Sequence, residues 1–297
     1  MANLKEIRTR KASVASTRQI TSAMKMVAAA KLRKAQDAIT QLRPYAELLQ
    51  DILVSLGGSL RDDNHNPYLR DDEHPEKILL VLITSNRGLC GAFNSNAIKS
   101  TIHRALTTYP NQMLEHDLYF AAIGRKGSDF LRKKGYNLVY SNEEIFDDLT
   151  FENATAIAEK LMTQFVKWDY DRIDLIYNQF KNAGTQIMQE EQFLPINVPD
   201  PDESGEPSVA SVDYIFEPSK EYIVEELIPR SLKLQFYKAL LDSNASEHGA
   251  RMTAMHKATD NATELIKELN LEYNKARQAS ITNEILEITS GAEALKG

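Results

Sequence analysis

Cys90 is the side chain with the clearest potential for chemistry, because it stands in the glycine-bearing stretch NRGLCGAFN at 86–94. The stretch follows an apolar run that predicts a strand and precedes a segment that predicts a helix. A thiol at a helix start ionises more readily, because the helix dipole favours the thiolate. No histidine that could act as its base lies nearby in sequence. A small buried thiol is therefore the favoured interpretation, and a nucleophile whose base comes from a distant segment stays open.

The glycines of the same stretch raise the question of phosphate binding. The stretch lacks the G-x-G-x-x-G order that brings a helix N-terminus against a pyrophosphate. The chain also contains no G-x-x-x-x-G-K-[ST] phosphate loop. The sequence therefore disfavours nucleotide binding.

The residues that bind metals or exchange protons are scattered along the chain. The six histidines show no metal-ligand spacing, and His248 and His256 stand eight residues apart, about two helical turns, which is too far for one ion. The adjacent acids Glu143-Glu144 and Asp147-Asp148 are typical of a solvated loop. We expect no catalytic residue, no cofactor and no metal site.

The elements around Cys90 alternate between strands and helices. The longest apolar run, Ile78 to Ile83, has six residues and predicts a buried strand, since a membrane helix needs about twenty. The alternation predicts a parallel, Rossmann-like sheet. Strands are predicted at 77–85, 117–124, 136–141, 172–180, 185–196 and 211–218, and helices at 92–109, 128–134 and 151–168.

The last fifty residues carry an apolar pattern in which steps of three and four residues alternate. This pattern is typical of a long helix that packs along another helix. Its positions are Met252, Met255, Thr259, Ala262, Ile266, Leu269, Tyr273, Ala276 and Ser280, after which it shifts by one residue and continues through Ile281, Ile285, Ile288, Ala292 and Leu295.

The N-terminal segment offers a partner for that helix. Residues 1–43 contain neither proline nor glycine and are predicted to form a helix. Pro44 is expected to interrupt or kink this helix, and Gly57-Gly58 is expected to end it. We expect an antiparallel coiled coil within one molecule, while an ordinary bundle and pairing with a second copy stay open. The same alternating step appears at Leu32, Ala35, Ile39, Leu42, Ala46, Leu49, Leu53 and Leu56.

These elements predict an α/β fold, in which a long antiparallel coiled coil of the N- and C-terminal helices is joined to a central Rossmann-like α/β lobe. The predicted division is an N-terminal coiled-coil helix at 1–57, a linker at 58–76, the lobe at 77–218 and a C-terminal coiled-coil helix at 219–297. The acidic stretch at 200–207 is expected to be a mobile loop.

Composition and charge narrow the class of protein. The chain of 297 residues is 42% hydrophobic and 26% charged, which indicates neither bulk disorder nor a membrane span. Its single cysteine excludes an internal disulfide and suits a reducing compartment. Residues 1–43 carry a net charge of +8 within a chain of −7. Nucleic acid is disfavoured as the counterpart of this basic segment, because no aromatic precedes Tyr45 and the remainder of the chain is acidic.

The basic, serine-bearing N-terminus also fits a mitochondrial targeting peptide. The helical pattern disfavours that interpretation, because it continues into the apolar seam without a cleavage site.

Several separated motifs, in the same order, resemble the gamma subunit of F-type ATP synthases. SITNEILEITSGAEAL at 280–295 is similar to the C-terminal signature of that family, and SEHGARMTAMHKATDNA and YNKARQ are similar to the preceding part of the same helix. TRQITSAMKMVAAAKLRKAQ resembles the N-terminal helix, and RGLCGAFN and GRKG resemble turns of the central lobe. The resemblance covers nearly the whole chain.

The resemblance implies a central-stalk rotor subunit. In that family the coiled coil lies inside a ring of alternating alpha and beta subunits, and the lobe sits with epsilon on the c ring. Ion flow turns the c ring and the shaft, and the shaft drives the beta subunits through their binding states. The implied partners are therefore the alpha, beta and epsilon subunits and the c ring, without nucleic acid. The implied location is the cytoplasmic face of a bacterial plasma membrane, reached only through the complex, with the mitochondrial inner membrane as the less favoured place.

The resemblance also points to residues that would contact partners. Six positions match the family's contacts with the alpha and beta ring: Met24, Lys25, Arg251, Gln278, Thr282 and Glu284. Tyr214 and Glu217 match the foot that touches the c ring and epsilon, and Arg87 matches the arginine of the central turn. For each residue, an ordinary packing or surface role is the alternative.

Two residues depart from the family pattern. Asn86 stands where aspartate is usual, and Gly249 stands where alanine is usual. Because a glycine inside a helix costs about 1 kcal/mol relative to alanine, we expect local softness near Arg251 and a gain in stability for Gly249→Ala. The paired-cysteine insert of chloroplast relatives is absent.

Two other classes of function stay open on the sequence. A self-associating coiled-coil scaffold would form a homo-oligomer without foreign partners. A nucleotide-binding enzyme built on the α/β lobe would bind nucleotide as a purified chain.

Overall fold

The structure is a computed structural model that describes residues 4–55, 67–70, 75–196 and 220–294. It divides into two compact units. One unit comprises Met1–Ala28 and Arg251–Gly297, and the other comprises Ala29–Ala250. The strand predicted at 211–218 and the acidic stretch at 200–207 lie outside the described residues.

The unit Ala29–Ala250 contains a five-stranded sheet in the order β3-β2-β1-β4-β5. β1 pairs with β2 and β4, and β2 with β3, all in parallel, whereas β4 and β5 pair antiparallel. The sheet is thus mixed, because only Ala183 and Gly184 separate β4 from β5 and so short a connection forms a hairpin. The strands are β1 (Ile78–Ile83), β2 (Leu118–Ile123), β3 (Leu138–Asn142), β4 (Arg172–Asn182) and β5 (Thr185–Leu194).

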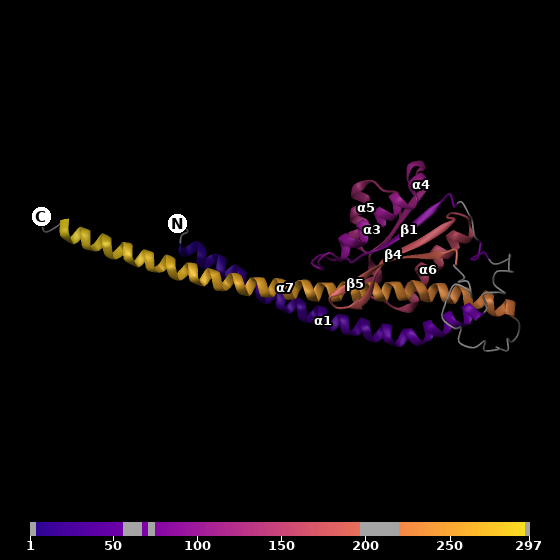
Figure 1. Ribbon diagram of the computed structural model, residues 1–297, viewed down its shortest axis with the longest axis horizontal. Helices are drawn as coiled ribbons and strands as arrows, with labels where there is room; N and C mark the ends of the chain where they lie inside the picture. The colour runs from indigo at the N-terminus through magenta and orange to yellow at the C-terminus, as the bar shows by residue number, and fades with distance from the viewer. Residues whose placement is uncertain (1–3, 56–66, 71–74, 197–219, 295–297) are drawn as a thin grey trace. The chain divides into compact units, whose positions relative to one another are not determined.

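Helices cover both faces of this sheet, and Figure 1 shows α3 and α5 on one side of it and α6 on the other. Alternate residues of β1 serve two cores. Ile78, Leu80 and Leu82 pack with residues of α3 and α5, whereas Leu79, Val81 and Ile83 pack with residues of α6 and α7. The continuous apolar run of β1 follows from this burial on both faces. The helices of the lobe are α3 (Phe93–Thr107), α4 (Pro110–Glu115), α5 (Arg125–Lys134) and α6 (Phe151–Val166), with a 3-10 turn at Glu144–Phe146.

Two long helices begin and end the described chain. α1 runs from Leu4 to Ser55 and α7 from Lys220 to Ala294. The interruption expected at Pro44 is absent, since α1 continues through this residue. α4 is an element that the sequence analysis missed, and it begins with Pro110 at a position where proline is favoured.

In the unit Met1–Ala28 with Arg251–Gly297, α1 and α7 form the expected antiparallel pair. Arg8 Nη2 donates to the Tyr273 hydroxyl at 3.0 Å, and the Thr21 and Thr259 hydroxyls lie 2.8 Å apart. From the first contact to the second, α1 advances thirteen residues while α7 goes back fourteen. None of the nine predicted seam positions from Met252 to Ser280 is exposed. The seam therefore lies where its periodicity predicted.

Gly249 lies against the β4–β5 hairpin. A Cβ atom built on it would stand 3.2 Å from Ala183 Cα, 3.4 Å from the Ala183 carbonyl oxygen and 3.4 Å from Phe180 Cε2. Two of these neighbours are backbone atoms, which cannot rotate away. Glycine at this position therefore permits a close approach of helix and hairpin, and the expected gain from alanine is not supported.

We predict that Gly249→Ala lowers the free energy of unfolding by about 1 kcal/mol, because overpacking at the hairpin outweighs the gain in helix propensity. Urea denaturation of the purified chain measures the change. Gly291→Ala is the matched control in the same helix, since its added Cβ meets nothing within 4 Å. If the Gly249→Ala chain is more stable than the parent, the close approach to the hairpin is not what requires glycine here, and the glycine only weakens the helix.

Asp242 of α7 is a buried acid, with 5% of its surface exposed. Burial raises the pKa of Asp242 to about 6, and the nearby Glu191 carboxylate adds to the rise. Lys238, Arg43 and a backbone hydrogen bond with Phe180 oppose it. The folded state therefore holds this proton more tightly than the unfolded state. The resulting stabilisation is complete below about pH 4 and is lost as the pH rises through about 6.

We predict that Asp242→Asn raises the free energy of unfolding by on the order of 2 kcal/mol at pH 7.5 and leaves it nearly unchanged at pH 4. The amide removes the cost of a buried charge only where the aspartate would be ionised. Urea midpoints at the two pH values measure the difference, with the exposed Asp129→Asn as control. An equal effect at both pH values would contradict the assignment.

Candidate partner-binding surface

The end of α7 exposes an apolar surface. Every residue from Ile281 to Glu293 is exposed. The seam predicted to continue there has no counterpart among the described residues of this unit, because α1 begins at Leu4 and Arg8 already contacts Tyr273. The large apolar side chains are Ile281 (47% exposed), Ile285 (55%), Leu286 (59%) and Ile288 (71%). A run of this kind indicates a surface that another protein covers.

The outer side of the coiled coil in the same unit adds further apolar residues. Ile20, Met26 and Val27 of α1 and Leu271 of α7 are each more than half exposed. They stand off the buried seam, whose α1 positions include Ile7, Thr21 and Ala28. The sequence analysis missed these exposed residues. They could have been found as large apolar side chains that do not fall at the spacing of the seam.

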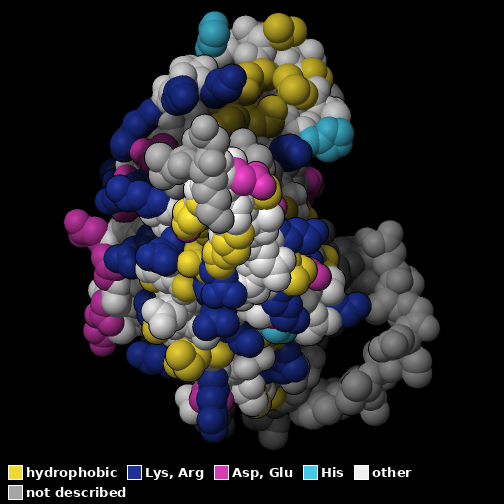
Figure 2. Space-filling model, turned by 90° about the vertical axis from the view of Figure 1, so that its left-hand side faces the viewer, with side chains coloured by type: hydrophobic (Ala, Val, Ile, Leu, Met, Phe, Trp, Pro, Cys, Tyr) yellow, Lys and Arg dark blue, Asp and Glu magenta, His cyan; other side chains and the backbone are white. Residues whose placement is uncertain are grey.

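Positive charge accompanies the exposed apolar residues of α1, whereas the α7 end at 281–293 carries Glu284, Glu287 and Glu293 and no Lys or Arg. Met1–Ala28 carries six basic side chains and one acidic side chain. Figure 2 shows many Lys and Arg side chains on the face turned to the viewer, with hydrophobic side chains between them. Together, the apolar and basic side chains suit a partner that presents apolar and acidic groups.

The six positions that match ring contacts all lie in this unit, and they form two groups. Met24 and Lys25 are half-buried and Arg251 is buried, whereas Gln278, Thr282 and Glu284 are exposed. Gln278 lies 27 positions after Arg251, which corresponds to about 40 Å along a helix. The Thr282 hydroxyl donates to the Gln278 carbonyl oxygen at 2.9 Å, and the Ser280 hydroxyl donates to Glu284 Oε1 at 3.3 Å. Tyr214 and Glu217 lie outside the described residues.

The turn after β1 is filled by its own side chains. Asn94 Oδ1 accepts the backbone N–H of Ser85 at 2.9 Å, and Asn94 Nδ2 donates to Ser85 Oγ at 2.8 Å and contacts Cys90 Sγ at 3.2 Å. Cys90 is 1% exposed, so the interpretation of a buried thiol is confirmed. Arg87 is exposed at the surface of this turn. The N–H of Ser85, which a phosphate could have used, is already bonded.

The turn after β2 closes the same edge of the sheet. Gly124 has φ +100°, and a Cβ there would stand 2.1 Å from the Thr84 carbonyl oxygen. The N–H of Gly127 donates to Thr84 Oγ1 at 2.8 Å. The glycines of GRKG thus bring this turn against the end of β1, without leaving room for a ligand between them.

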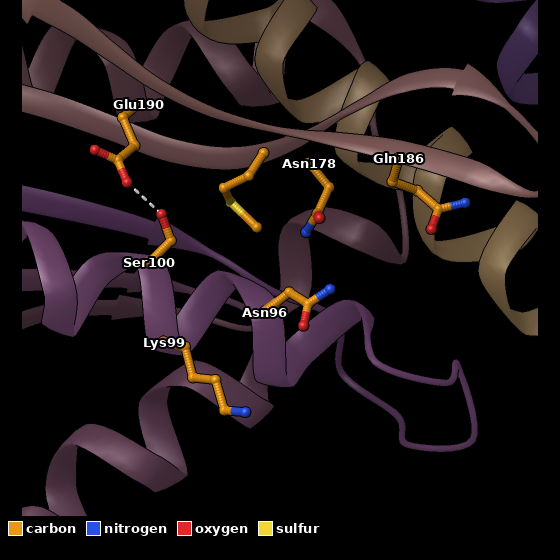
Figure 3. Close-up of a pocket in the computed structure, with 7 residues that line it drawn as sticks. Asn96, Lys99, Ser100, Asn178, Gln186 and Glu190 are labelled. Atoms are coloured by element: carbon orange, nitrogen blue, oxygen red, sulfur yellow. Dashed lines mark hydrogen bonds between the residues drawn. The ribbon is translucent and has the colours of Figure 1, made fainter.

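A polar hollow of about 580 Å³ lies between α3, β4 and β5. Figure 3 shows the Ser100 hydroxyl joined to the Glu190 carboxylate, with Asn96 and Asn178 at the same hollow and Lys99 pointing away from the strands. Its lining also includes Gln186 and Met188, and neither a histidine nor a cysteine is among the lining residues. Among the described residues, no three His, Cys, Asp or Glu side chains are grouped to hold a metal ion.

A family model described as ATP synthase matches residues 3–295. Two relatives named ATP synthase gamma chain align over all 297 residues, and over their own full lengths, at 58% identity in Christiangramia forsetii and 60% in Flavobacterium psychrophilum. The chain belongs to the ATP synthase gamma-chain family. The resemblance read from the motifs is thereby confirmed.

Solved structures agree with this membership in the gamma-chain family. A chain from the central stalk and c ring of the Tetrahymena thermophila mitochondrial ATP synthase is 28% identical, with a TM-score of 0.58 over 80% of this chain and 99% of that chain. A chain of the Euglena gracilis mitochondrial ATP synthase shares the fold, with 22% identity and a TM-score of 0.68 over 98% of this chain and 94% of that chain. No helix among the described residues is long and apolar enough to cross a membrane.

Asn86, where the sequence departs from the family pattern, uses both ends of its amide. Nδ2 donates to the Glu143 carbonyl oxygen, and Oδ1 accepts the backbone N–H of Arg125 at 3.0 Å. It therefore ties the ends of three strands together, β1 through its own position, β2 through Arg125 and β3 through Glu143. An aspartate could accept but, when ionised, could not donate.

We predict that Asn86→Asp lowers the free energy of unfolding by about 1–2 kcal/mol at pH 7, because the Glu143 carbonyl loses its donor. The loss shrinks below about pH 4, where a protonated aspartate donates again. Urea denaturation at both pH values measures it. Asn142→Asp is the matched control, because Asn142 Oδ1 accepts two backbone N–H groups that a carboxylate would keep. Asn142 Nδ2 donates to the Tyr140 hydroxyl, which can instead donate to a carboxylate. Equal losses in the two variants at pH 7 would contradict this role of Asn86.

Proposed function

We propose that this chain is the central-stalk rotor subunit of an F-type ATP synthase, and that it couples ion-driven rotation of the c ring to conformational cycling of the catalytic beta subunits. The observation that carries the proposal is the uncovered apolar end of α7, residues 281–293, in a chain of the gamma-chain family. A shaft that ends inside a ring of partner subunits needs such a surface.

The proposed partners are the alpha, beta and epsilon subunits and the c ring. Met24, Lys25 and Arg251 form one contact region with the alpha and beta ring, and Gln278, Thr282 and Glu284 form another. For Tyr214 and Glu217 we propose contact with the c ring and epsilon, on the family resemblance alone. Arg87 lies in the central turn, and we propose that it contacts a partner subunit there. Its side chain is exposed, which supports this role.

The mechanism follows from unequal contacts. A ligand or a shaft shifts a conformational equilibrium only as far as it binds one state better than another. Side chains on different sides of the coiled coil present apolar or basic groups, so the three beta subunits would meet different surfaces at any moment. The chain contributes no catalytic residue to ATP synthesis in this proposal, and the chemistry belongs to beta.

The proposed location is the cytoplasmic face of a bacterial plasma membrane, with the membrane reached only through the complex. Bacterial relatives with full-length alignments support it. We retain the division into helix 1–57, linker 58–76, lobe 77–218 and helix 219–297 as a proposal about function, in which the lobe docks at the c ring and the helices enter the ring of alpha and beta subunits.

The test uses a thiol placed on the apolar end. Ile288→Cys is the probe, Leu114→Cys on α4 is the control at 80% exposure, and the native Cys90 is buried. We expect maleimide labelling of Ile288→Cys to slow by about tenfold or more when the chain is purified with alpha and beta, because a covered side chain reacts only when the interface opens. Leu114→Cys should label at one rate throughout.

Other outcomes separate the alternatives. Slow labelling of Ile288→Cys in the purified chain alone, together with a homo-oligomer, would favour the coiled-coil scaffold. Labelling that stays fast in a complex with alpha and beta would overturn the proposed place of the α7 end. Failure to recover alpha and beta with the chain would overturn the rotor assignment itself.

A further inference from the structure

A crevice of about 560 Å³ lies within the unit Ala29–Ala250, and neither the family resemblance nor the proposed rotor function assigns it a role. It has three walls. α1 contributes Lys31, Lys34, Ala35 and Ala38, α7 contributes Tyr237, Leu241, Asn244 and His248, and the segment that leads into α6 contributes residues 146–151. The spacing on each helix places its residues on one side of that helix.

The floor of the crevice is apolar. Ala35 and Leu241 are buried, with 8% and 4% of their surfaces exposed. The rings of Phe151 and Tyr237 meet edge to face, with centroids 5.5 Å apart. The two alanines of α1 leave the space that larger side chains would have filled. A volume in the range of roughly 300–1,000 Å³ with an apolar lining and a few polar groups is typical of sites for small molecules.

The charges at the rim favour an anion. Lys31 and Lys34 are exposed, and neither forms an ion pair with any residue that the structure describes. The acids Asp147 and Asp148 stand on the opposite wall, so the wall formed by α1 is the side that attracts an anion. Asp148 accepts hydrogen bonds from Asn153 Nδ2 at its carbonyl and at its carboxylate, at 2.9 and 3.3 Å. Asp147 also borders a second hollow, which contains Arg125.

We propose that this crevice binds a small amphipathic anion. The apolar body of the ligand lies on Ala35, Leu241 and the Phe151–Tyr237 pair, and its carboxylate or sulfonate lies between the ammonium groups of Lys31 and Lys34. Such a ligand would contact α1, α7 and the segment before α6 at once, and so would hold the three elements together. The proposal does not rest on the rotor function, and the isolated full-length chain suffices to test it.

The probe is 1-anilinonaphthalene-8-sulfonate, which fluoresces in apolar sites and carries one sulfonate. We expect saturable binding that Lys31→Gln/Lys34→Gln weakens by about tenfold, as the loss of charge-assisted contacts requires. Ala38→Phe should fill the crevice and remove this binding, and a misfolded chain would instead bind more dye. Lys133→Gln/Lys134→Gln, on the exposed end of α5, is the matched charge control and should bind as the parent does.

A pair of competitors tests the need for a negative charge. Decanoate should displace the dye at a concentration at least about tenfold lower than 1-decanol does, and added salt should narrow the difference because it screens exposed charges. Dye binding that is unchanged in both Lys31→Gln/Lys34→Gln and Ala38→Phe would place the dye on the exposed apolar residues of the coiled coil and overturn the proposal. Equal displacement by decanoate and 1-decanol would overturn the anionic preference.

Discussion

The lobe depends on the burial of one stretch of α7 against the sheet. Ile228, Leu232, Phe236, Ala239 and Leu240 are fully or almost fully buried in the core that they share with α6 and alternate residues of β1. The rings of Phe193 and Phe236 lie 5.9 Å apart between strand and helix. Without this stretch, α6 alone would cover the apolar side chains on this face of the sheet, among them Leu79, Leu175 and Phe193. Burial of apolar area is the dominant favourable term in folding, so α7 is as much a part of the lobe as the strands are.

Along α7 the character of the buried residues changes. Large side chains pack on the sheet at 228–240, and the glycine at 249 meets the hairpin backbone. In the seam from Met252 to Ser280, four of the nine positions are Ala, Ser or Thr. Beyond that point the apolar residues have no cover within the described part of their unit. One helix thus passes from a lobe core to a thin intramolecular pair, and then to a surface suited to other proteins.

Local periodicity made much of this fold predictable. The five described strands, the main helices and the seam from Met252 to Ser280 were predicted correctly because each repeats a short spacing. The family was identified from motifs that stay in order along the chain. Contacts of individual residues with the backbone of distant segments were not predictable. The reversed direction of β5 depends on a two-residue connection, the role of Gly249 depends on the backbone of Ala183, and the donor role of Asn86 depends on the Glu143 carbonyl. The interruption expected at Pro44 was wrong, because α1 continues through this residue.

The seam between α1 and α7 also has a consequence for the order of events in biogenesis. Its contacts include a pair of threonine hydroxyls and several alanines, which bury little apolar area and contribute little to stability. The lobe, with two apolar cores, can fold as soon as its chain is complete. In the proposed complex the partner subunits would cover the thin pair, and the ordering of the coiled coil would be coupled to their binding. A chain of this design would enter assembly with a folded lobe and a shaft that its partners stabilise.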